Sequence, residues 1–145
     1  MSGTTADVGV NGRTAPCIRS RVKHDHVILL VEDDPWSRDA IAAVLEAFDF
    51  VVSEASDGQD ALDQLAAGYR PCAILLDLMM PRMDGWEFRQ RQRNNPELAK
   101  IPVALLTATA NIRLHASRLA VDASFSKPLD FDGVIDFIDG HCGDA

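Results

Sequence analysis

The sequence has no long hydrophobic run, few cysteines and fewer basic than acidic residues. No apolar stretch approaches the roughly 20 residues that a membrane-spanning helix needs, and the polar N-terminus lacks the apolar segment of a secretory signal. These absences predict a soluble, cytoplasmic protein without a membrane partner. With 145 residues, of which 47% are hydrophobic, the chain can form one domain with a full core. A second domain of ordinary size does not fit.

Cysteine is not only scarce but also unpatterned. Cys17, Cys72 and Cys142 are odd in number and show no C-x-x-C or Cys/His ligand spacing. The sequence therefore predicts neither a disulfide framework nor a zinc site. Cys72 is interpreted as a small core residue.

The charge is unevenly distributed. The formal net charge is −8, which disfavours direct DNA binding because phosphates would be repelled. Residues 1–24 carry +3, which leaves −11 for residues 25–145. Because residues 1–24 lack apolar periodicity, they are predicted to be a disordered, mildly basic tail. The folded domain is placed at 25–145.

The stretch in the middle of the chain, residues 72–85, is the most informative for function. Residues 72–76 are a continuous apolar run that is followed by Asp77, as expected for a strand that is covered on both faces. Pro81 and the turn pair Asp84-Gly85 require the chain to leave the sheet soon afterwards. Asp77 therefore lies at the carboxyl end of a buried strand, where open α/β sheets bind ligands. On this stretch alone, a solvated strand-end carboxylate is an equally good interpretation.

Four further strands and five helices follow from similar patterns. Strands are predicted at 26–31, 50–52, 72–76, 101–106 and 123–126, and helices near 35–48, 58–67, 86–93, 112–119 and 130–140. Asp34 and Asn111 are candidate N-caps, Pro35 suits a first helical position, and Gly68 suits a C′ position. Strands that alternate with helices predict an α/β fold with a parallel sheet and helices on both faces.

In such a sheet all carboxyl ends share one edge, and four signals fall along it. They are Glu32-Asp33, residues 76–85 (LDLMMPRMDG), Thr107-Ala108 and Lys127-Pro128. In this order they resemble the receiver domain of bacterial two-component response regulators, the CheY-like family, over about residues 26–140. The resemblance implies a flavodoxin-like, doubly wound five-stranded sheet of order 2-1-3-4-5, which the sequence pattern alone does not fix.

The resemblance also implies a phosphoryl-transfer site. Asp77 would be the phosphoacceptor. Mg²⁺, or Mn²⁺ in its place, would be bound directly by Asp33, Asp77 and the main-chain carbonyl of Met79. Glu32 would act through metal-bound water. A divalent cation suits the chemistry because it neutralises both the attacking carboxylate and the phosphoryl oxygens.

Two other edge positions would contact the phosphoryl group. Thr107, followed by Ala108, would donate its hydroxyl, and Lys127 would supply a compact cation. Pro128 in this family commonly follows a cis peptide bond that aims the lysine. Taken singly, Thr107 and Lys127 are better explained as a strand-end hydroxyl and a loop cation. Together with Asp77, they favour the functional interpretation.

The chain also departs from the family. Ser124 stands where an aromatic residue commonly takes part in switching, and Phe125 should face the opposite side of its strand. Ala120 replaces a frequent glycine. The alternating Arg89, Arg91 and Arg93 are interpreted as a solvated face and not as a phosphate-binding patch.

The leading hypothesis is a stand-alone receiver that catalyses its own phosphorylation and slow dephosphorylation but turns over no metabolite. The donor would be a sensor histidine kinase or a histidine phosphotransfer protein. Output to an unidentified protein target, or homodimerisation, would use the face of the fourth helix, fifth strand and fifth helix. One alternative is a Mg²⁺-dependent phosphohydrolase with an Asp nucleophile, although Met79 replaces its usual second Asp. The other is a receiver-like binding module that is independent of phosphorylation, which Ser124 would fit.

Overall fold

The computed structural model describes residues 26–78, 80, 83–108 and 112–142, without the side chains of 112 and 113. The strands are β1 (Val27–Val31), β2 (Val51–Ala55), β3 (Ala73–Asp77), β4 (Val103–Thr107) and β5 (Ala123–Ser126). The helices are α1 (Pro35–Ala47), α2 (Gly58–Ala66), α3 (Gly85–Asn94), the 3₁₀ helix η2 (Leu98–Lys100), α4 (Ile112–Leu119) and α5 (Phe131–His141).

The five strands form one parallel sheet in the order β2-β1-β3-β4-β5. All residues of β3 and β4 are buried, as expected for central strands that are covered on both faces. The doubly wound fold and the strand order 2-1-3-4-5 are therefore confirmed. Because the pairing is parallel throughout, the carboxyl ends of all strands meet at one edge.

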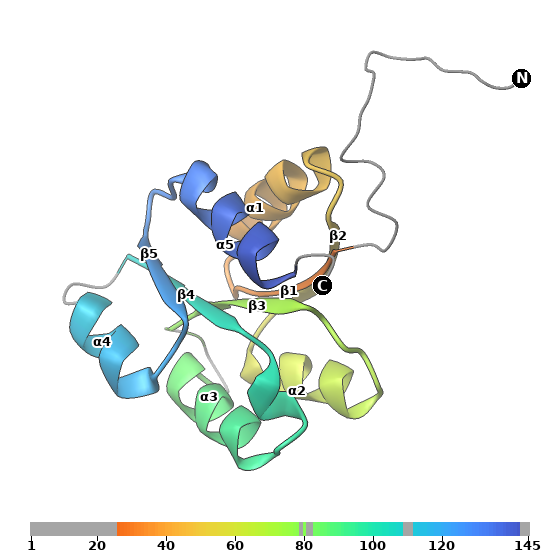
Figure 1. The fold of residues 1–145 in the computed structure, drawn as a ribbon, viewed down its shortest axis with the longest axis vertical. Helices are drawn as coiled ribbons and strands as arrows, with labels where there is room; N and C mark the ends of the chain where they lie inside the picture. The colour runs from red at the N-terminus through yellow and green to blue at the C-terminus, as the bar shows by residue number, and fades with distance from the viewer. Residues whose placement is uncertain (1–25, 79, 81–82, 109–111, 143–145) are drawn as a thin grey trace, which may run out of the picture.

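Helices cover both faces of this sheet (Figure 1): α1 and α5 lie on one side, and α2, α3 and α4 on the other. Alternate residues of each strand serve the two faces. Ile28 and Leu30 of β1 belong to a core cluster with α1 and α5, whereas Leu29 and Val31 belong to a cluster with α2 and α3. Both sets are apolar, because both faces of the sheet are covered.

The helix boundaries follow local chemistry. The side chain of Asp34 accepts a hydrogen bond from the Ser37 N–H at 3.0 Å, and Pro35 is the first residue of α1, as predicted. Gly68 follows the end of α2 with a φ of +107°, which suits the predicted C′ position. β4 begins at Val103, two residues later than predicted, because Ile101 ends η2. Asn111 lies outside the described residues.

The cysteine prediction was wrong. Cys72, just before β3, forms a disulfide bond with Cys142 at the end of α5, with a Cα–Cα distance of 5.3 Å. The sequence separation is 70 residues, so no local spacing indicates the pair. Only the packing of α5 on the sheet brings the two cysteines together.

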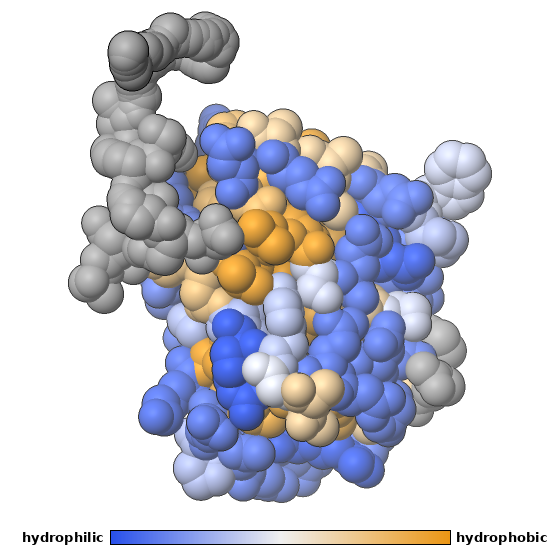
Figure 2. All heavy atoms as spheres, turned by 90° about the vertical axis from the view of Figure 1, so that its right-hand side faces the viewer, coloured by the Kyte–Doolittle hydropathy of each residue, from blue (hydrophilic) through white to orange (hydrophobic). Residues whose placement is uncertain are grey.

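Within the described part of the chain, no helix is both long enough and apolar enough to cross a membrane. The view onto the β2 side shows hydrophobic atoms gathered in one area on a largely hydrophilic face (Figure 2). Large apolar side chains that are exposed include Phe48 and Val51 near this edge strand, Leu114 on α4, and Trp36 at the start of α1.

Candidate functional site

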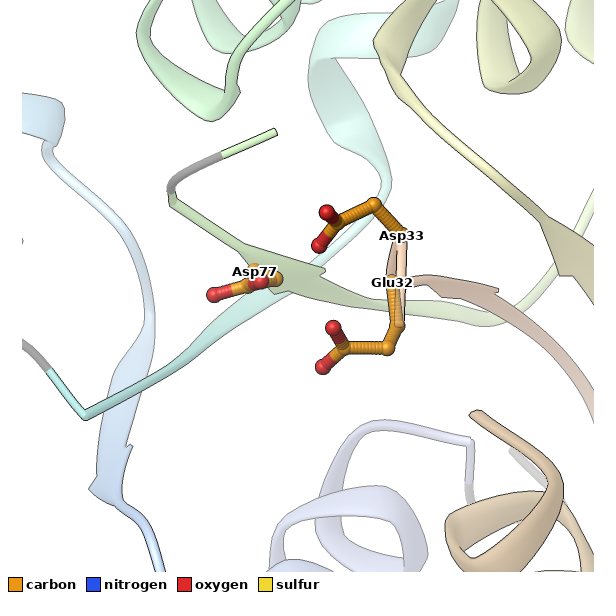
Figure 3. A group of neighbouring side chains, drawn as sticks. All are labelled: Glu32, Asp33 and Asp77. Atoms are coloured by element: carbon orange, nitrogen blue, oxygen red, sulfur yellow. The ribbon is translucent and has the colours of Figure 1, made fainter. Parts of the chain in front are cut away.

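Three carboxylates meet at the carboxyl edge of the sheet. Glu32 and Asp33 directly follow β1, and Asp77 is the last residue of β3 (Figure 3). The two strands are neighbours, with Val31 opposite Leu76. Each carboxylate offers an oxygen within 4.8 Å of the others. The structure therefore brings together the three acidic residues that the sequence singled out.

The carboxylates are only partly accessible to water. Glu32 is 2% exposed and Asp77 is 7% exposed, while Asp33 is half-buried. Burial raises the pKa of Asp77 to about 7; the charge of Glu32 adds to this rise, and Lys127 opposes it. The pKa of Asp33 is also raised, first by burial and then by the charge of Glu32. Three crowded carboxylates at neutral pH need a cation nearby.

Lys127 supplies one positive charge to this cluster. Its ammonium group forms an ion pair and hydrogen bond with the Glu32 carboxylate. Its backbone N–H donates to the Thr107 carbonyl at 3.0 Å, which anchors the loop after β5 to the end of β4. The peptide bond between Lys127 and Pro128 is cis, as the family resemblance implies.

Thr107 lies next to the acidic cluster in the sheet. β3 and β4 pair with Asp77 opposite Leu106, so Thr107 is one residue further along the same edge. Thr107 is 1% exposed, and Ala108 after it is exposed. The two predicted phosphoryl contacts, Thr107 and Lys127, thus come from neighbouring strands on one side of Asp77.

Arg38 supports the acidic loop, although sequence reasoning did not select it. Its guanidinium donates to the main-chain oxygens of Glu32, at 2.9 Å, and Asp33, at 3.5 Å. The same group donates to the carboxylate of Glu54 on β2 at 3.2 Å. In the sequence Arg38 is an ordinary helical arginine, because bonds to main-chain carbonyls leave no pattern there.

Gly85 is a second residue to which the sequence analysis gave no role at the site, although it belongs to the turn pair and to the 76–85 stretch. It is the first residue of α3, and the Asp84 side chain caps this helix by accepting from the Glu87 N–H at 3.0 Å. A Cβ atom at Gly85 would lie 2.8 Å from the main-chain oxygen of Asp77. The missing side chain therefore lets α3 begin directly against the strand end that carries Asp77.

The structure shows the surroundings of Ser124, which stands where an aromatic residue is common in the family. Ser124 is opposite Leu105 in the sheet, and Phe125 is opposite Leu106. The Phe125 ring packs on the α5 side of the sheet, edge-to-face with Phe137 at 6.4 Å between ring centroids. Phe125 therefore faces away from the side of Ser124, as predicted, and does not replace the aromatic residue that is missing there. Met79 lies outside the described residues.

Fold and site together define the class of CheY-like α/β signalling domains. The profile of the response regulator receiver domain matches residues 28–139, and the chain belongs to this family. It is 36% identical over 108 residues to the response regulator Rre1 of Synechocystis, covering 72% of this chain and 46% of that protein. The DNA-binding dual master transcriptional regulator RpaA of Synechocystis is 34% identical over 110 residues, covering 74% and 45%. The chain thus spans less than half of either relative.

Solved receiver structures have the same fold. The receiver domain of the sensor histidine kinase PA1611 from Pseudomonas aeruginosa superposes with a TM-score of 0.74 at 26% identity, covering 83% of this chain and 99% of that one. That structure holds a magnesium ion in its active-site cleft. The chemotaxis response regulator CheY4 of Vibrio cholerae gives a TM-score of 0.71 at 23% identity, covering 81% and 98%.

Proposed function

We propose that this receiver domain accepts a phosphoryl group on Asp77 from a phosphohistidine of a partner protein. The supporting observation is the meeting of Glu32, Asp33 and Asp77 within 4.8 Å, with Lys127 against them. In the reaction an Asp77 carboxylate oxygen forms a bond to phosphorus while the bond between phosphorus and the histidine nitrogen breaks. The donor histidine leaves with the bonding electron pair and takes up a proton.

The donor set fits a hard divalent cation. Glu32, Asp33 and Asp77 offer only oxygen. Burial, and then the charge of Glu32, raises the pKa of Asp77 and of Asp33, and a bound cation would oppose this rise. Glu32, Asp33 and Asp77 would hold Mg²⁺, or Mn²⁺ in its place, with the Met79 carbonyl as a further ligand. The ion would supply charge neutralisation between the carboxylates and the incoming phosphoryl oxygens.

The other site residues would orient the phosphoryl group. Lys127 would move its ammonium from Glu32 to a phosphoryl oxygen, which needs only a change in side-chain torsions because its backbone is tied to Thr107. The hydroxyl of Thr107, from the same edge, would donate to another phosphoryl oxygen. Ala108, the next residue, is small and exposed, and leaves the way to this oxygen open.

The donor would be a sensor histidine kinase or a histidine phosphotransfer protein in the cytoplasm. Output would pass to a protein partner, or to a second copy of the chain, through the face of α4, β5 and α5, with Ser124 and Pro128 at its edge. Phosphorylation needs only to change the relative free energies of two conformations of this face. The net charge of −8 supports a protein target and opposes direct DNA contact by this domain.

The test is phosphorylation of the purified protein by acetyl phosphate and Mg²⁺, followed by intact mass. We expect a gain of one phosphoryl group in the parent chain and none in Asp77→Asn. Asp63→Asn, which alters an exposed aspartate on α2, should label like the parent. EDTA should abolish labelling. A label that survives in Asp77→Asn would refute the assignment.

The same experiment separates the two alternative functions. A phosphohydrolase would release phosphate continuously from a phosphomonoester such as p-nitrophenyl phosphate, and would hold little label. A binding module independent of phosphorylation would show no mass gain, either from acetyl phosphate or from a phosphorylated histidine kinase. A stable gain on Asp77 with slow loss of phosphate supports the proposed receiver function.

A further inference from the structure

A groove of about 440 Å³ lies between α3 and α4. The two helices are neighbours on the same side of the sheet (Figure 1). The groove is lined by Trp86, Arg89, Gln90, Arg93, Asn94, Arg118 and Leu119. None of these residues belongs to the proposed phosphoryl-transfer site.

The lining is strongly cationic in an otherwise acidic protein. It contains Arg89, Arg93 and Arg118 and, among the described residues, no carboxylate. Arg89 and Arg93 are four residues apart on α3 and therefore share one face. Arg91 lies elsewhere on the helix and pairs with Glu87 at 2.8 Å. The interpretation of the α3 arginines as a solvated face is wrong for Arg89, which is buried. Arg91 and Arg93 are exposed, as that interpretation expected.

Arg89 is the buried member of this group, with 7% exposure. Its guanidinium donates to the main-chain oxygens of Leu119, at 3.0 Å, and Ala120, and to the side-chain oxygen of Gln92 at 2.7 Å. All three acceptors are neutral. Burial and the charge of Arg93 lower the pKa of Arg89, and the charge of Asp122 opposes this. A fixed buried cation thus faces the groove without a carboxylate in ion-pair contact among the described residues.

The remaining lining residues add contacts for a flat ring. The Trp86 indole is held edge-to-face by His115, with ring centroids 5.3 Å apart and an interplanar angle of 83°. Gln90 and Asn94, one helical turn apart, present amide groups that both donate and accept. Guanidinium forks match the geometry of phosphate oxygens, and aromatic side chains stack on nucleobases.

We propose that the α3–α4 groove binds a small phosphate-bearing ligand of the nucleotide class. The phosphates would contact Arg93 and Arg118, with Arg89 behind them, and the base would pack on Trp86. The groove volume lies within the roughly 300–1,000 Å³ that is usual for small-molecule sites. An extended acidic peptide is a poorer occupant, because residues 25–145 carry a net charge of −11 and would repel the part that extends beyond the groove.

The test is a fluorescence titration of the full chain with ADP, in EDTA and without Mg²⁺, so that the acidic cluster does not contribute. A Trp36→Phe host leaves Trp86 as the only tryptophan; Trp36 is 83% exposed, so its loss should not disturb the fold. We expect a saturable change in Trp86 emission and an affinity that falls as salt is raised. Pyrophosphate and adenosine should each bind at least about tenfold more weakly than ADP.

Matched variants locate the site. Arg93→Gln and Arg118→Gln should each weaken ADP binding about tenfold or more. Arg91→Gln removes the same charge from another face of the same helix, and should leave the affinity within about twofold once the salt effect is matched. Thermal unfolding of each variant checks that the fold is kept.

Several outcomes would overturn the proposal. The first is the absence of saturable ADP binding. The second is an equal loss of ADP affinity in Arg91→Gln and Arg93→Gln. The third is an unchanged ADP affinity in both Arg93→Gln and Arg118→Gln. Equal affinity for pyrophosphate and ADP would exclude a nucleotide as the ligand, because the base would then gain nothing from packing on Trp86. Tighter binding of an oligoglutamate peptide than of ADP would assign the groove to an acidic protein segment instead.

Discussion

The ammonium group of Lys127, beyond the end of β5, forms an ion pair with Glu32, beyond the end of β1. The two residues are 95 positions apart in the chain. Glu32 also accepts from the Asp34 N–H at 3.1 Å, so its carboxylate holds together the loop before α1 and the loop before α5. In this arrangement Lys127 offsets the charge of the acidic cluster before any phosphoryl group arrives.

Replacement of Lys127 by Met should therefore destabilise the protein at pH 8 in EDTA. We expect a loss of about 1–3 kcal/mol in the free energy of unfolding, because the buried Glu32 carboxylate would lose its cation. The loss is limited because the Lys127 side chain is partly exposed to solvent. Urea denaturation measures this loss, and added Mg²⁺ should recover part of it. Lys100→Met, at an exposed position, is the control. Equal effects of the two substitutions would contradict the prediction.

Asp77→Asn should stabilise the metal-free protein, and this gain should depend on pH. The pKa of Asp77 in the folded state is raised to about 7 from an ordinary value of 3.8, so the folded state binds this proton more tightly than the unfolded state. The stability that goes with the bound proton is lost as the pH rises from about 4 through 7. We expect Asn to add about 1–3 kcal/mol at pH 8 and little at pH 4.5.

Urea denaturation in EDTA at the two pH values checks the effect of Asp77→Asn. Asn keeps an oxygen for the Leu78 N–H, which donates to Asp77 Oδ1 at 2.8 Å. The comparison therefore isolates the charge. A gain of the same size at pH 4.5 and pH 8 would show that the buried charge of Asp77 is not its source.

Mg²⁺ affinity should rise with pH. Ligand carboxylates must lose their protons, and the pKa of Asp77 is about 7. Below this value the affinity should fall up to about tenfold per pH unit. Calorimetric titration at pH 6 and pH 8 measures the change. Asp33→Asn should weaken binding at both pH values, whereas Asp63→Asn should not. An affinity that is equal at pH 6 and pH 8 would contradict the raised pKa.

Reduction of the Cys72–Cys142 disulfide should lower stability. A bond that closes a loop over a separation of 70 residues restricts the unfolded chain, and we expect its loss to cost about 2–4 kcal/mol. Urea denaturation with and without dithiothreitol measures this cost. Cys72→Ser should have the free energy of unfolding of the reduced parent, and dithiothreitol should not change it. In Cys17→Ser, dithiothreitol should lower the free energy of unfolding as much as in the parent. A parent chain that is insensitive to the reductant would refute the prediction.

Ala120→Gly should stabilise the protein. Ala120 follows α4 with a φ of +55°, a left-handed conformation that disfavours residues with a Cβ atom. Removal of the Cβ should add about 0.5–1 kcal/mol, after allowance for the greater freedom of glycine in the unfolded chain. Thermal unfolding measures the gain. Ala66→Gly, inside the last turn of α2, should have the opposite sign, and a loss in both variants would contradict the explanation.

Most of the fold follows from local sequence. The apolar runs that end at Val31 and Asp77 predict buried strands, and Asp34 with Pro35 marks the start of α1, because capping and strand burial depend on near neighbours. The placing of Glu32, Asp33 and Asp77 at one edge follows too, since parallel strands share the edge where their carboxyl ends lie. The strand order came from the family resemblance, because periodicity does not say which strands are adjacent.

Other relationships were not predictable from the sequence because they join distant parts of the chain. Arg38 contacts main-chain oxygens, and the disulfide between Cys72 and Cys142 depends on where α5 packs. The groove between α3 and α4 needs Arg118 to lie beside Arg93, which no spacing in the chain expresses.

The sequence by itself determined which residues form strands and helices and which polar side chains end the strands, because these properties depend on local propensity and burial. Tertiary structure decided which charges meet. Lys127 reaches Glu32, Arg38 holds the acidic loop, and three arginines share a groove, because the crossover connections bring together segments that are far apart in the chain.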